Sequence, residues 1–266
     1  MPELLLVIIL GIVEGVTEYL PVSSTGHLIL ATELMGYDAD QWALFNIAIQ
    51  PGAILAILVL YWRTFRDVAV GLVKREAAAW RFVRNIAVAF FPAVVIGLAF
   101  GDRIEMMLGN AMIVAWALII GGFAILAVEH LARPTESGGV ANVTLKQSVV
   151  VGLVQCVAMI PGVSRSAATI LGAMAMGVDR KTAAEFSFFL AVPTLTGATV
   201  LQLAKHHDQL QPGMTGNILL GALVSFVVAI VVVKAFVAII QRYGFKPFAY
   251  YRIVAGSAAL VWLALR

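Results

Sequence analysis

Residues 14–27, EGVTEYLPVSSTGH, place two carboxylates, several hydroxyls and an imidazole in a chain that is otherwise strongly apolar. Glu14 and Glu18 are four residues apart, so both side chains project from one face of a helix. Two carboxylates on one face repel each other unless a cation lies between them or one is protonated. Oxygen ligands of this kind suit Mg²⁺ or Ca²⁺, above all where substrate phosphates complete the coordination shell. We therefore predict that Glu14 and Glu18 bind a divalent cation.

The same stretch contains a candidate nucleophile. Ser24 and His27 are three residues apart, the separation at which side chains on one helical turn are neighbours. A histidine beside a serine can accept the hydroxyl proton and generate a nucleophile. Alternatively, His27 attacks phosphorus itself or protonates the leaving group. The residues alone leave these roles open, and a purely structural role for one buried histidine is the simpler alternative.

A second polar cluster, IPGVSRS at residues 160–166, carries the one basic residue between Lys146 and Arg180. A charge such as that of Arg165 costs a few kcal/mol or more at the centre of a bilayer unless it is paired or solvated. It needs an anion, and the structural alternative is that it only balances Glu18. New helices are predicted to begin near Thr25 and Ser166 with serine caps, and helix N-termini favour phosphate binding. The predicted phosphate-binding residues are Ser23, Thr25, Gly26, Ser164, Arg165, Ser166 and Thr169.

The composition shows what kind of chain must position these groups. Of 266 residues, 61% are hydrophobic and 12% charged, about half the charged fraction of a soluble domain. The long apolar runs do not alternate with polar residues, which favours membrane helices over a barrel. Cys156 is the single cysteine, so no intramolecular disulfide can form. The N-terminus lacks a basic segment and a cleavage site, so we expect mature structure there and not a signal peptide.

The predicted fold class is an all-α polytopic membrane protein forming one membrane domain, 1–266. It has about six transmembrane helices and two re-entrant helix-loop-helix hairpins, because the hairpin pieces are short and have polar tips containing Pro or Gly. Gln50-Pro51-Gly52 should interrupt the first span, and Gln50 is a candidate to line a cavity. The predicted spans are 41–62, 85–100, 111–131, 182–204, 216–240 and 248–265, and the hairpin pieces are 3–20 with 24–36 and 147–160 with 165–177.

The positions of basic residues predict the orientation. The polar stretch 63–84 is rich in arginine and lysine, and further basic residues lie in the linker 132–146, before the span at 182 and in the loop 241–247. If each pair of short pieces leaves the membrane on the side where it entered, all these connections lie on one side. That side should be the cytoplasm.

The chain also repeats itself. A shift of 141 residues aligns 11–30 with 152–171, so that Gly11, Val22, Ser23 and other residues meet identical ones. On the predicted topology each copy, about 1–131 and about 147–265, contains one hairpin and three spans, with 132–146 as the linker. An odd number of spans makes the copies antiparallel, and such inverted repeats bring broken segments together at a midplane binding site. The two polar tips should therefore face each other inside the protein.

At these residues the sequence resembles the bacterial undecaprenyl-diphosphate phosphatases, also called bacitracin-resistance proteins. EGVTEYLPVSSTGHL matches the first motif of that family and PGVSRSAATI the second, and the resemblance covers essentially the whole chain. It implies dephosphorylation of undecaprenyl diphosphate, recycling of the lipid carrier for cell-wall synthesis, a divalent cation, and a site in the bacterial inner membrane that opens to the periplasm. The family's active residues correspond to Glu14, Glu18, Ser24, His27 and Arg165, with Ser23, Thr25, Ser164 and Thr169 nearby.

The predicted mechanism is an in-line attack on the terminal phosphorus. Ser24 is the favoured nucleophile, His27 its base or the acid for the leaving group, and Arg165 neutralises charge on the transferred phosphoryl group. The alternative is a transporter or flippase for a phosphorylated polyprenyl lipid, which would need Arg165 but no nucleophile. Expected partners are a polyprenyl diphosphate and membrane lipid, with no nucleic acid. The sequence leaves open a homodimer, the choice of cation, and direct attack by water.

Overall fold

The computed structural model describes residues 3–108, 110–133, 135, 138–209 and 214–265. Within them the regular structure is helical apart from one isolated bridge between Thr135 and Val178, which confirms the all-α class. Six helical segments are long and apolar enough to cross a membrane, as predicted. They are α3 (Ala39–Ala48) with α4 (Gln50–Leu60), α6 (Ala77–Leu108), α7 (Ala111–Leu131), α10 (Arg180–Lys205), α11 (Met214–Tyr243) and α12 (Lys246–Leu265).

The predicted short pieces form two helix–turn–helix pairs. α1 (Glu3–Thr17) packs against α2 (Ser24–Leu34), and α8 (Leu145–Gln155), extended by the 3-10 turn Cys156–Met159, packs against α9 (Arg165–Ala175). At 1.5 Å per residue α1 is about 22 Å long, shorter than the roughly 30 Å hydrocarbon core of a bilayer. The two pairs therefore match the predicted pieces in length and position. Their re-entrant placement in a membrane remains a prediction.

The predicted polar stretch 63–84 is mostly helical. α5 (Trp62–Val73) occupies its first half, and α6 begins at Ala77, eight residues before the predicted start of that span. Arginine and lysine are good helix formers, so the basic residues lengthen the helices where the hydropathy ends. Only the turn at Lys74–Glu76, with Arg75 at a positive φ of 58°, separates the two helices.

The first span is interrupted where the sequence predicts it. α3 ends at Ala48 and α4 begins at Gln50, with Pro51 in its first turn, where the missing amide proton of proline is tolerated. The side chain of Gln50 lines a cavity, which confirms that expectation.

Helices from the two halves of the chain pack against each other. α1 contacts α11, α8 contacts α6, and α7 lies along α12. The close approaches depend on glycine: a Cβ added to Gly11 would lie 2.7 Å from the Gly221 carbonyl oxygen, and one added to Gly152 would lie 2.6 Å from that of Ala89. Gly11 and Gly152 are separated by the shift of the predicted repeat. The division into two inverted copies stays a prediction.

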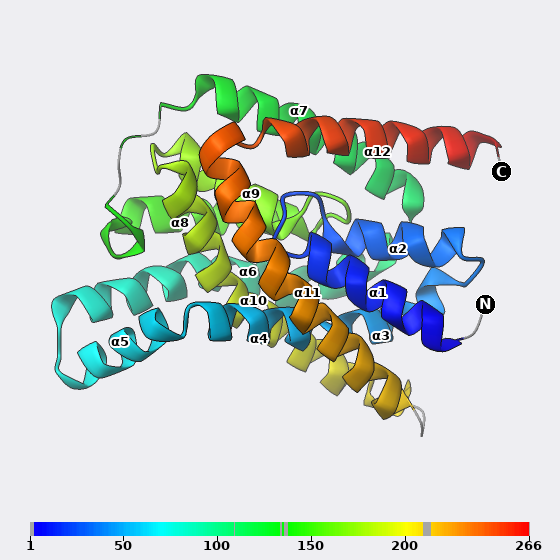
Figure 1. The fold of residues 1–266 in the computed structure, drawn as a ribbon, viewed down its shortest axis with the longest axis horizontal. Helices are drawn as coiled ribbons and strands as arrows, with labels where there is room; N and C mark the ends of the chain where they lie inside the picture. Colours follow the sequence, from blue (N-terminus) through cyan, green and yellow to red (C-terminus); the bar gives the residue numbers. More distant parts are fainter. Residues whose placement is uncertain (1–2, 109, 134, 136–137, 210–213, 266) are drawn as a thin grey trace.

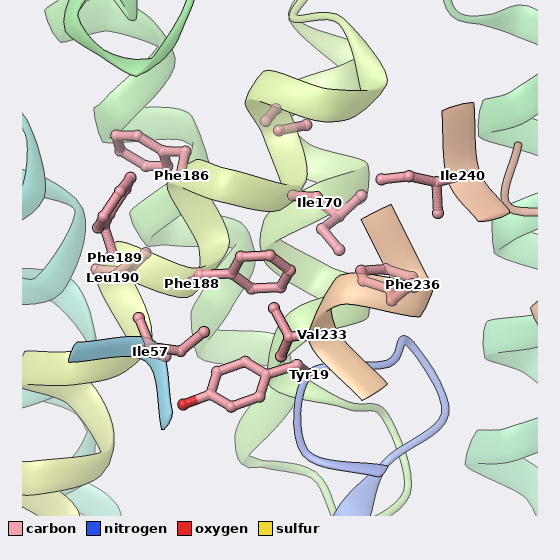
Figure 2. Close-up of a cluster of buried hydrophobic side chains, with 14 of the residues drawn as sticks. Tyr19, Ile57, Ile170, Phe186, Phe188, Phe189, Leu190, Val233, Phe236 and Ile240 are labelled. Atoms are coloured by element: carbon pink, nitrogen blue, oxygen red, sulfur yellow. The ribbon is translucent and has the colours of Figure 1, made fainter. Parts of the chain in front are cut away.

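An aromatic cluster supports the first polar tip from one side. Phe188 of α10 lies beside Tyr19, which is in the turn after α1, and Phe236 of α11 lies on the other side of Phe188 (Figure 2). The rings of Tyr19 and Phe188 meet edge to face with centroids 5.4 Å apart. The Tyr19 hydroxyl donates to the Ala53 carbonyl at 2.9 Å, so both the ring and its polar end are fixed.

The two ends of the molecule differ in charge. In Figure 1 both chain termini lie at the right, whereas α5 and the connection from α7 to α8 lie at the left. These left-hand segments contain much of the basic sequence. At the same end Arg180 pairs with Glu129 at 2.5 Å, and Thr135 donates its amide to the Gly177 carbonyl.

Candidate active site

Both polar tips end in a serine with unusual backbone geometry. Tip one is residues 18–23, between α1 and α2, and tip two is residues 160–164, ahead of α9. Ser23 and Ser164 have φ values of 74° and 79°, a region that costs a non-glycine residue about 1–3 kcal/mol. Each hydroxyl caps the next helix, accepting from the amides of Gly26 and Ala167 respectively. The predicted helix starts near Thr25 and Ser166 are thus confirmed to within one residue.

The two tips meet at Glu18. One carboxylate oxygen accepts from Arg165 Nη2 at 2.9 Å, and the other accepts from the Ser24 hydroxyl at 2.5 Å. Glu18 and Arg165 have side chains only 4% and 10% exposed. Since Glu18 and Ser24 come from the first half of the chain and Arg165 from the second, the predicted meeting of the tips is confirmed.

α10 orients Arg165 from behind. Arg165 Nη1 donates to the carbonyl and the hydroxyl of Ser187 at 2.8 and 3.1 Å, and Arg165 lies over the ring of Tyr19 at 5.7 Å. Thr169 donates to the Ser187 hydroxyl at 2.7 Å, which places it behind the arginine. The guanidinium is therefore held by Glu18 on one side and Ser187 on the other, while its Nε atom has no partner among the described residues.

A cavity of about 830 Å³ opens from this centre. Its inner end presents carboxylate, hydroxyl and guanidinium groups, its walls are largely apolar, and its outer end is charged. The inner residues are Glu18, Ser23, Ser24, Thr25, Ser164 and Arg165. The wall includes Phe90, Val94, Leu98, Leu201, Gln50, Gln155 and Thr194, and the outer end has Asp102, Arg103, Glu105 and Lys205. A polar pocket at the end of an apolar channel suits a molecule with an anionic head and a hydrocarbon tail.

The other predicted phosphate ligands stand behind the cavity wall. Ser166 donates to the Leu20 carbonyl at 2.7 Å and so ties tip two to tip one. Gly26 packs against α7, where an added Cβ would lie 2.9 Å from Val114 Cγ1. Thr169, which donates to the Ser187 hydroxyl, does not line the cavity either. Ser166, Gly26 and Thr169 therefore support the residues that face the cavity.

Glu14 is buried one helical turn before Glu18. The Glu18 amide donates to the Glu14 carbonyl at 3.0 Å, so the predicted one-face arrangement of the pair is formed. Both carboxylate oxygens of Glu14 are buried without a hydrogen-bond partner among the described residues. A buried carboxylate needs a compensating cation or a proton. This unmet requirement fits a divalent cation held by Glu14 and Glu18, although no group of three or more acidic, histidine or cysteine side chains gathers within the described part of the chain.

Both ring nitrogens of His27 have partners other than the Ser24 hydroxyl. Its Nδ1 lies 2.8 Å from the Ser23 carbonyl oxygen, and its Nε2 lies 2.7 Å from the Tyr251 hydroxyl. The rings of His27 and Tyr251 stack with centroids 5.5 Å apart. The Ser24 hydroxyl thus has Glu18, and not His27, as its acceptor in this structure.

Arg252, on α12, holds the two tips together and is fully buried. It donates to five backbone carbonyls: those of Ala117 and Leu118 in α7, Pro21 in tip one, and Gly162 and Val163 in tip two. Neither Arg252 nor its neighbour Tyr251 is among the site residues predicted from the sequence. A signal was present, because an arginine inside an apolar span is costly by the argument applied to Arg165.

Comparison with known proteins gives one consistent result. The family model described as bacitracin resistance protein BacA matches residues 7–258. A protein named undecaprenyl-diphosphatase from Novosphingobium aromaticivorans is 57% identical over 270 residues, covering all of both chains. Proteins of the same name from Sphingopyxis alaskensis and Bdellovibrio bacteriovorus are 52% and 46% identical. Those alignments cover 99% of both chains for the first, and 96% of this chain and 94% of the relative for the second.

Proposed function

This chain belongs to the BacA family of bacitracin resistance proteins, and on that premise we propose that it hydrolyses undecaprenyl diphosphate to undecaprenyl phosphate and inorganic phosphate. The observation that carries the proposal is the chain of contacts from Arg165 through Glu18 to Ser24 at the inner end of the cavity. It combines a nucleophile, a proton acceptor and a cationic group for phosphate within one hydrogen-bonded unit. A transporter of a phosphorylated lipid would need Arg165 but would not need a nucleophile.

The diphosphate head would occupy the inner end of the cavity, with its isoprenoid tail along the apolar wall. Ser24 Oγ attacks the terminal phosphorus while its proton passes to Glu18, the acceptor it already contacts. The bond from that phosphorus to the bridging oxygen breaks, and undecaprenyl phosphate leaves. Water then cleaves the phosphoserine, releasing phosphate and returning the proton to Ser24.

Charge on the transferred phosphoryl group is stabilised by groups that the fold has already oriented. Arg165 is held by Glu18 and Ser187, so it needs little reorganisation to face the developing charge. The hydroxyls of Ser23 and Thr25 and the N-terminus of α2 lie at the same end of the cavity. Glu14 and Glu18 would hold Mg²⁺ or Ca²⁺, which when bound neutralises phosphate charge and helps to orient the head group.

The chain is a multi-pass membrane protein, and we infer that it lies in the bacterial inner membrane with the cavity open to the periplasm. This is supported by the separation of charges along the molecule. Asp102 and Lys205, at the outer end of the cavity, lie in the last turns of α6 and at the end of α10, whereas the basic connections gather at the end where α5 lies (Figure 1). Basic connections favour the cytoplasm.

The test is phosphate release from undecaprenyl diphosphate by detergent-purified protein, with Mg²⁺, with Ca²⁺ and after chelation. Wild type should release phosphate only with a cation, and Ser24→Ala should lower kcat by about 10³-fold or more, as expected for loss of a nucleophile. Ser148→Ala is the matched control, because Ser148 is a buried serine near the start of α8 that does not line the cavity and whose hydroxyl donates to the Thr144 carbonyl. No release from folded wild type with either cation would refute the proposal.

A further inference from the structure

We propose that His27 serves the reaction by holding the backbone of tip one, and that Tyr251 of α12 is the positioning residue that holds His27. This inference rests on the proposed phosphatase function and assigns the imidazole a part that involves no proton transfer to or from substrate. It starts from two observations: neither ring nitrogen of His27 contacts Ser24, and each has another partner.

The partners of the imidazole determine its tautomer. A carbonyl oxygen can only accept, so the contact with Ser23 requires a proton on Nδ1. In the neutral ring Nε2 is then an acceptor, and the Tyr251 hydroxyl must donate to it. Both nitrogens of a neutral His27 are satisfied in this way, and no nitrogen is left for the Ser24 hydroxyl.

The Ser23 carbonyl determines where Ser24 points. This carbonyl accepts both the amide of His27, at 3.1 Å, and the imidazole Nδ1, at 2.8 Å. It belongs to the peptide unit that joins Ser23 to Ser24, and Ser23 is in the left-handed region with φ of 74°. Holding that carbonyl therefore fixes the peptide plane from which the Ser24 hydroxyl reaches Glu18 at 2.5 Å.

The second tip has the same backbone turn without this brace. Ser164 also has a positive φ, but Ala168 occupies the position that corresponds to His27 under the shift of 141 residues. There the Ser164 hydroxyl lies 2.9 Å from that of Ser166. The hydrogen bond from an imidazole to the serine carbonyl is thus found only at the tip that precedes the proposed nucleophile, Ser24, among the described residues.

Tyr251 is well placed to act on His27 from outside the cavity. Its ring stacks on the imidazole with an interplanar angle of 14°, and α12 is fixed by its packing along α7. Neither His27 nor Tyr251 lines the cavity, whereas Ser23 and Ser24 do. The pair can therefore affect the reaction through the position of the serine and not by touching substrate.

Four variants separate positioning from acid–base chemistry. His27→Asn puts an amide N–H near the place of Nδ1 and can keep the hydrogen bond to the Ser23 carbonyl without a titrating ring. His27→Ala removes the hydrogen bonds to both Ser23 and Tyr251. Tyr251→Phe keeps the stacked ring and removes the donor, and Tyr250→Phe makes the same change at the adjacent exposed tyrosine as a control. Each variant is assayed for phosphate release across pH, with kcat and KM measured separately.

We expect Tyr251→Phe to lower kcat by about 3- to 10-fold, the value of one neutral hydrogen bond, with KM unchanged and Tyr250→Phe like wild type. His27→Asn should keep at least about a tenth of wild-type kcat and the wild-type pH profile, because it loses the hydrogen bond and the ring stack with Tyr251 but can keep the bond to Ser23. His27→Ala should be far less active. Equal loss in His27→Asn and His27→Ala, with a fully active Tyr251→Phe, would overturn the inference.

A spectroscopic measurement on wild type is independent of turnover. In ¹⁵N spectra of imidazole-labelled protein, with His27→Asn used for assignment, His27 should carry its proton on Nδ1. A proton on Nε2 would overturn the inference even if every variant folded poorly. An inactive wild type would refute the proposed function and leave this readout standing, so the two failures are distinguishable.

Discussion

Removing the guanidinium of Arg252 should loosen both tips at once. Arg252 donates to carbonyls in tip one, in tip two and in α7, at distances between 2.9 and 3.2 Å. Arg252→Met keeps a long unbranched side chain in the same space and removes all five bonds. Arg252→Lys keeps the charge but offers three donors on one atom in place of a planar fork of five.

The size of the effect follows from which carbonyls lose their donor. Those of Ala117 and Leu118 lie within α7 and also accept helical bonds, whereas those of Pro21, Gly162 and Val163 lie in turns. A buried acceptor left without a partner costs about 1–3 kcal/mol, so three of them cost about 3–9 kcal/mol. Removing a buried charge offsets part of this cost. We expect Arg252→Met to lower the free energy of unfolding by about 3 kcal/mol or more, and Arg252→Lys by roughly half of that.

Activity should fall together with stability, because Ser24 directly follows tip one and Arg165 directly follows tip two. A misplacement of about 1 Å between reacting groups can cost 100-fold in rate. The measurements are unfolding in detergent followed by tryptophan fluorescence, and kcat for phosphate release below the unfolding transition. Gly121→Ala is a second perturbation, since the added methyl group would collide with the Arg252 guanidinium without removing its charge.

The control is Arg242→Met, the same substitution at an exposed residue near the end of α11, where the side chain stacks on Tyr243. It should leave the unfolding transition and kcat close to wild type. If Arg252→Met also behaved like wild type in both measurements, the carbonyls would not depend on Arg252, and the reasoning would be refuted.

Two further predictions concern the cation and the helix packing. Glu14→Gln keeps the shape of a side chain whose carboxylate has no hydrogen-bond partner among the described residues, so the free energy of unfolding should be retained. The cation concentration for half-maximal phosphate release should rise about tenfold or more. An unchanged cation titration would exclude Glu14 as a ligand. Gly152→Ala forces a Cβ to within 2.6 Å of the Ala89 carbonyl oxygen and should lower the free energy of unfolding by about 1–3 kcal/mol. Gly216→Ala, where an added Cβ meets nothing within 4 Å, is its control, and equal stability of the two variants would contradict the packing argument.

The meeting of Glu18 and Arg165 was predictable because each is a charge in an apolar chain that needs a partner. The helix starts at the two tips were predictable for a similar reason, since serine at the start of a helix has a direct physical signature. The first prediction follows from an imbalance of charge, and the second from a signal that is local in the sequence.

The partners of His27 and Arg252 were not predictable in this way. The spacing correctly indicates that His27 and Ser24 share a helical turn. It does not reveal that the Ser23 carbonyl, next to a left-handed φ, lies within hydrogen-bond distance of the imidazole. Nor does it reveal that Glu18 accepts the hydrogen bond from the Ser24 hydroxyl. Tyr251 is 224 residues from His27, and Arg252 binds backbone carbonyls, which every residue has. Neither contact leaves a pattern of residue types.

The pattern of satisfied and unsatisfied groups around the tips leads us to expect that the state of the substrate head group affects binding. Four ionisable side chains with little exposure lie around the tips, Glu14, Glu18, Arg165 and Arg252, and of these Glu18 and Arg165 form an ion pair. Arg252 donates to backbone carbonyls, and Glu18 accepts from both Arg165 and Ser24. Around the tips, the groups without a hydrogen-bond partner among the described residues are the Glu14 carboxylate and Arg165 Nε. A diphosphate without a cation could accept a hydrogen bond from Arg165 Nε. It would also add negative charge near Glu14, which is unfavourable in a region of low dielectric constant. A diphosphate that carries a divalent cation would add less negative charge there, so we expect the site to bind the head group more tightly when Mg²⁺ or Ca²⁺ is present.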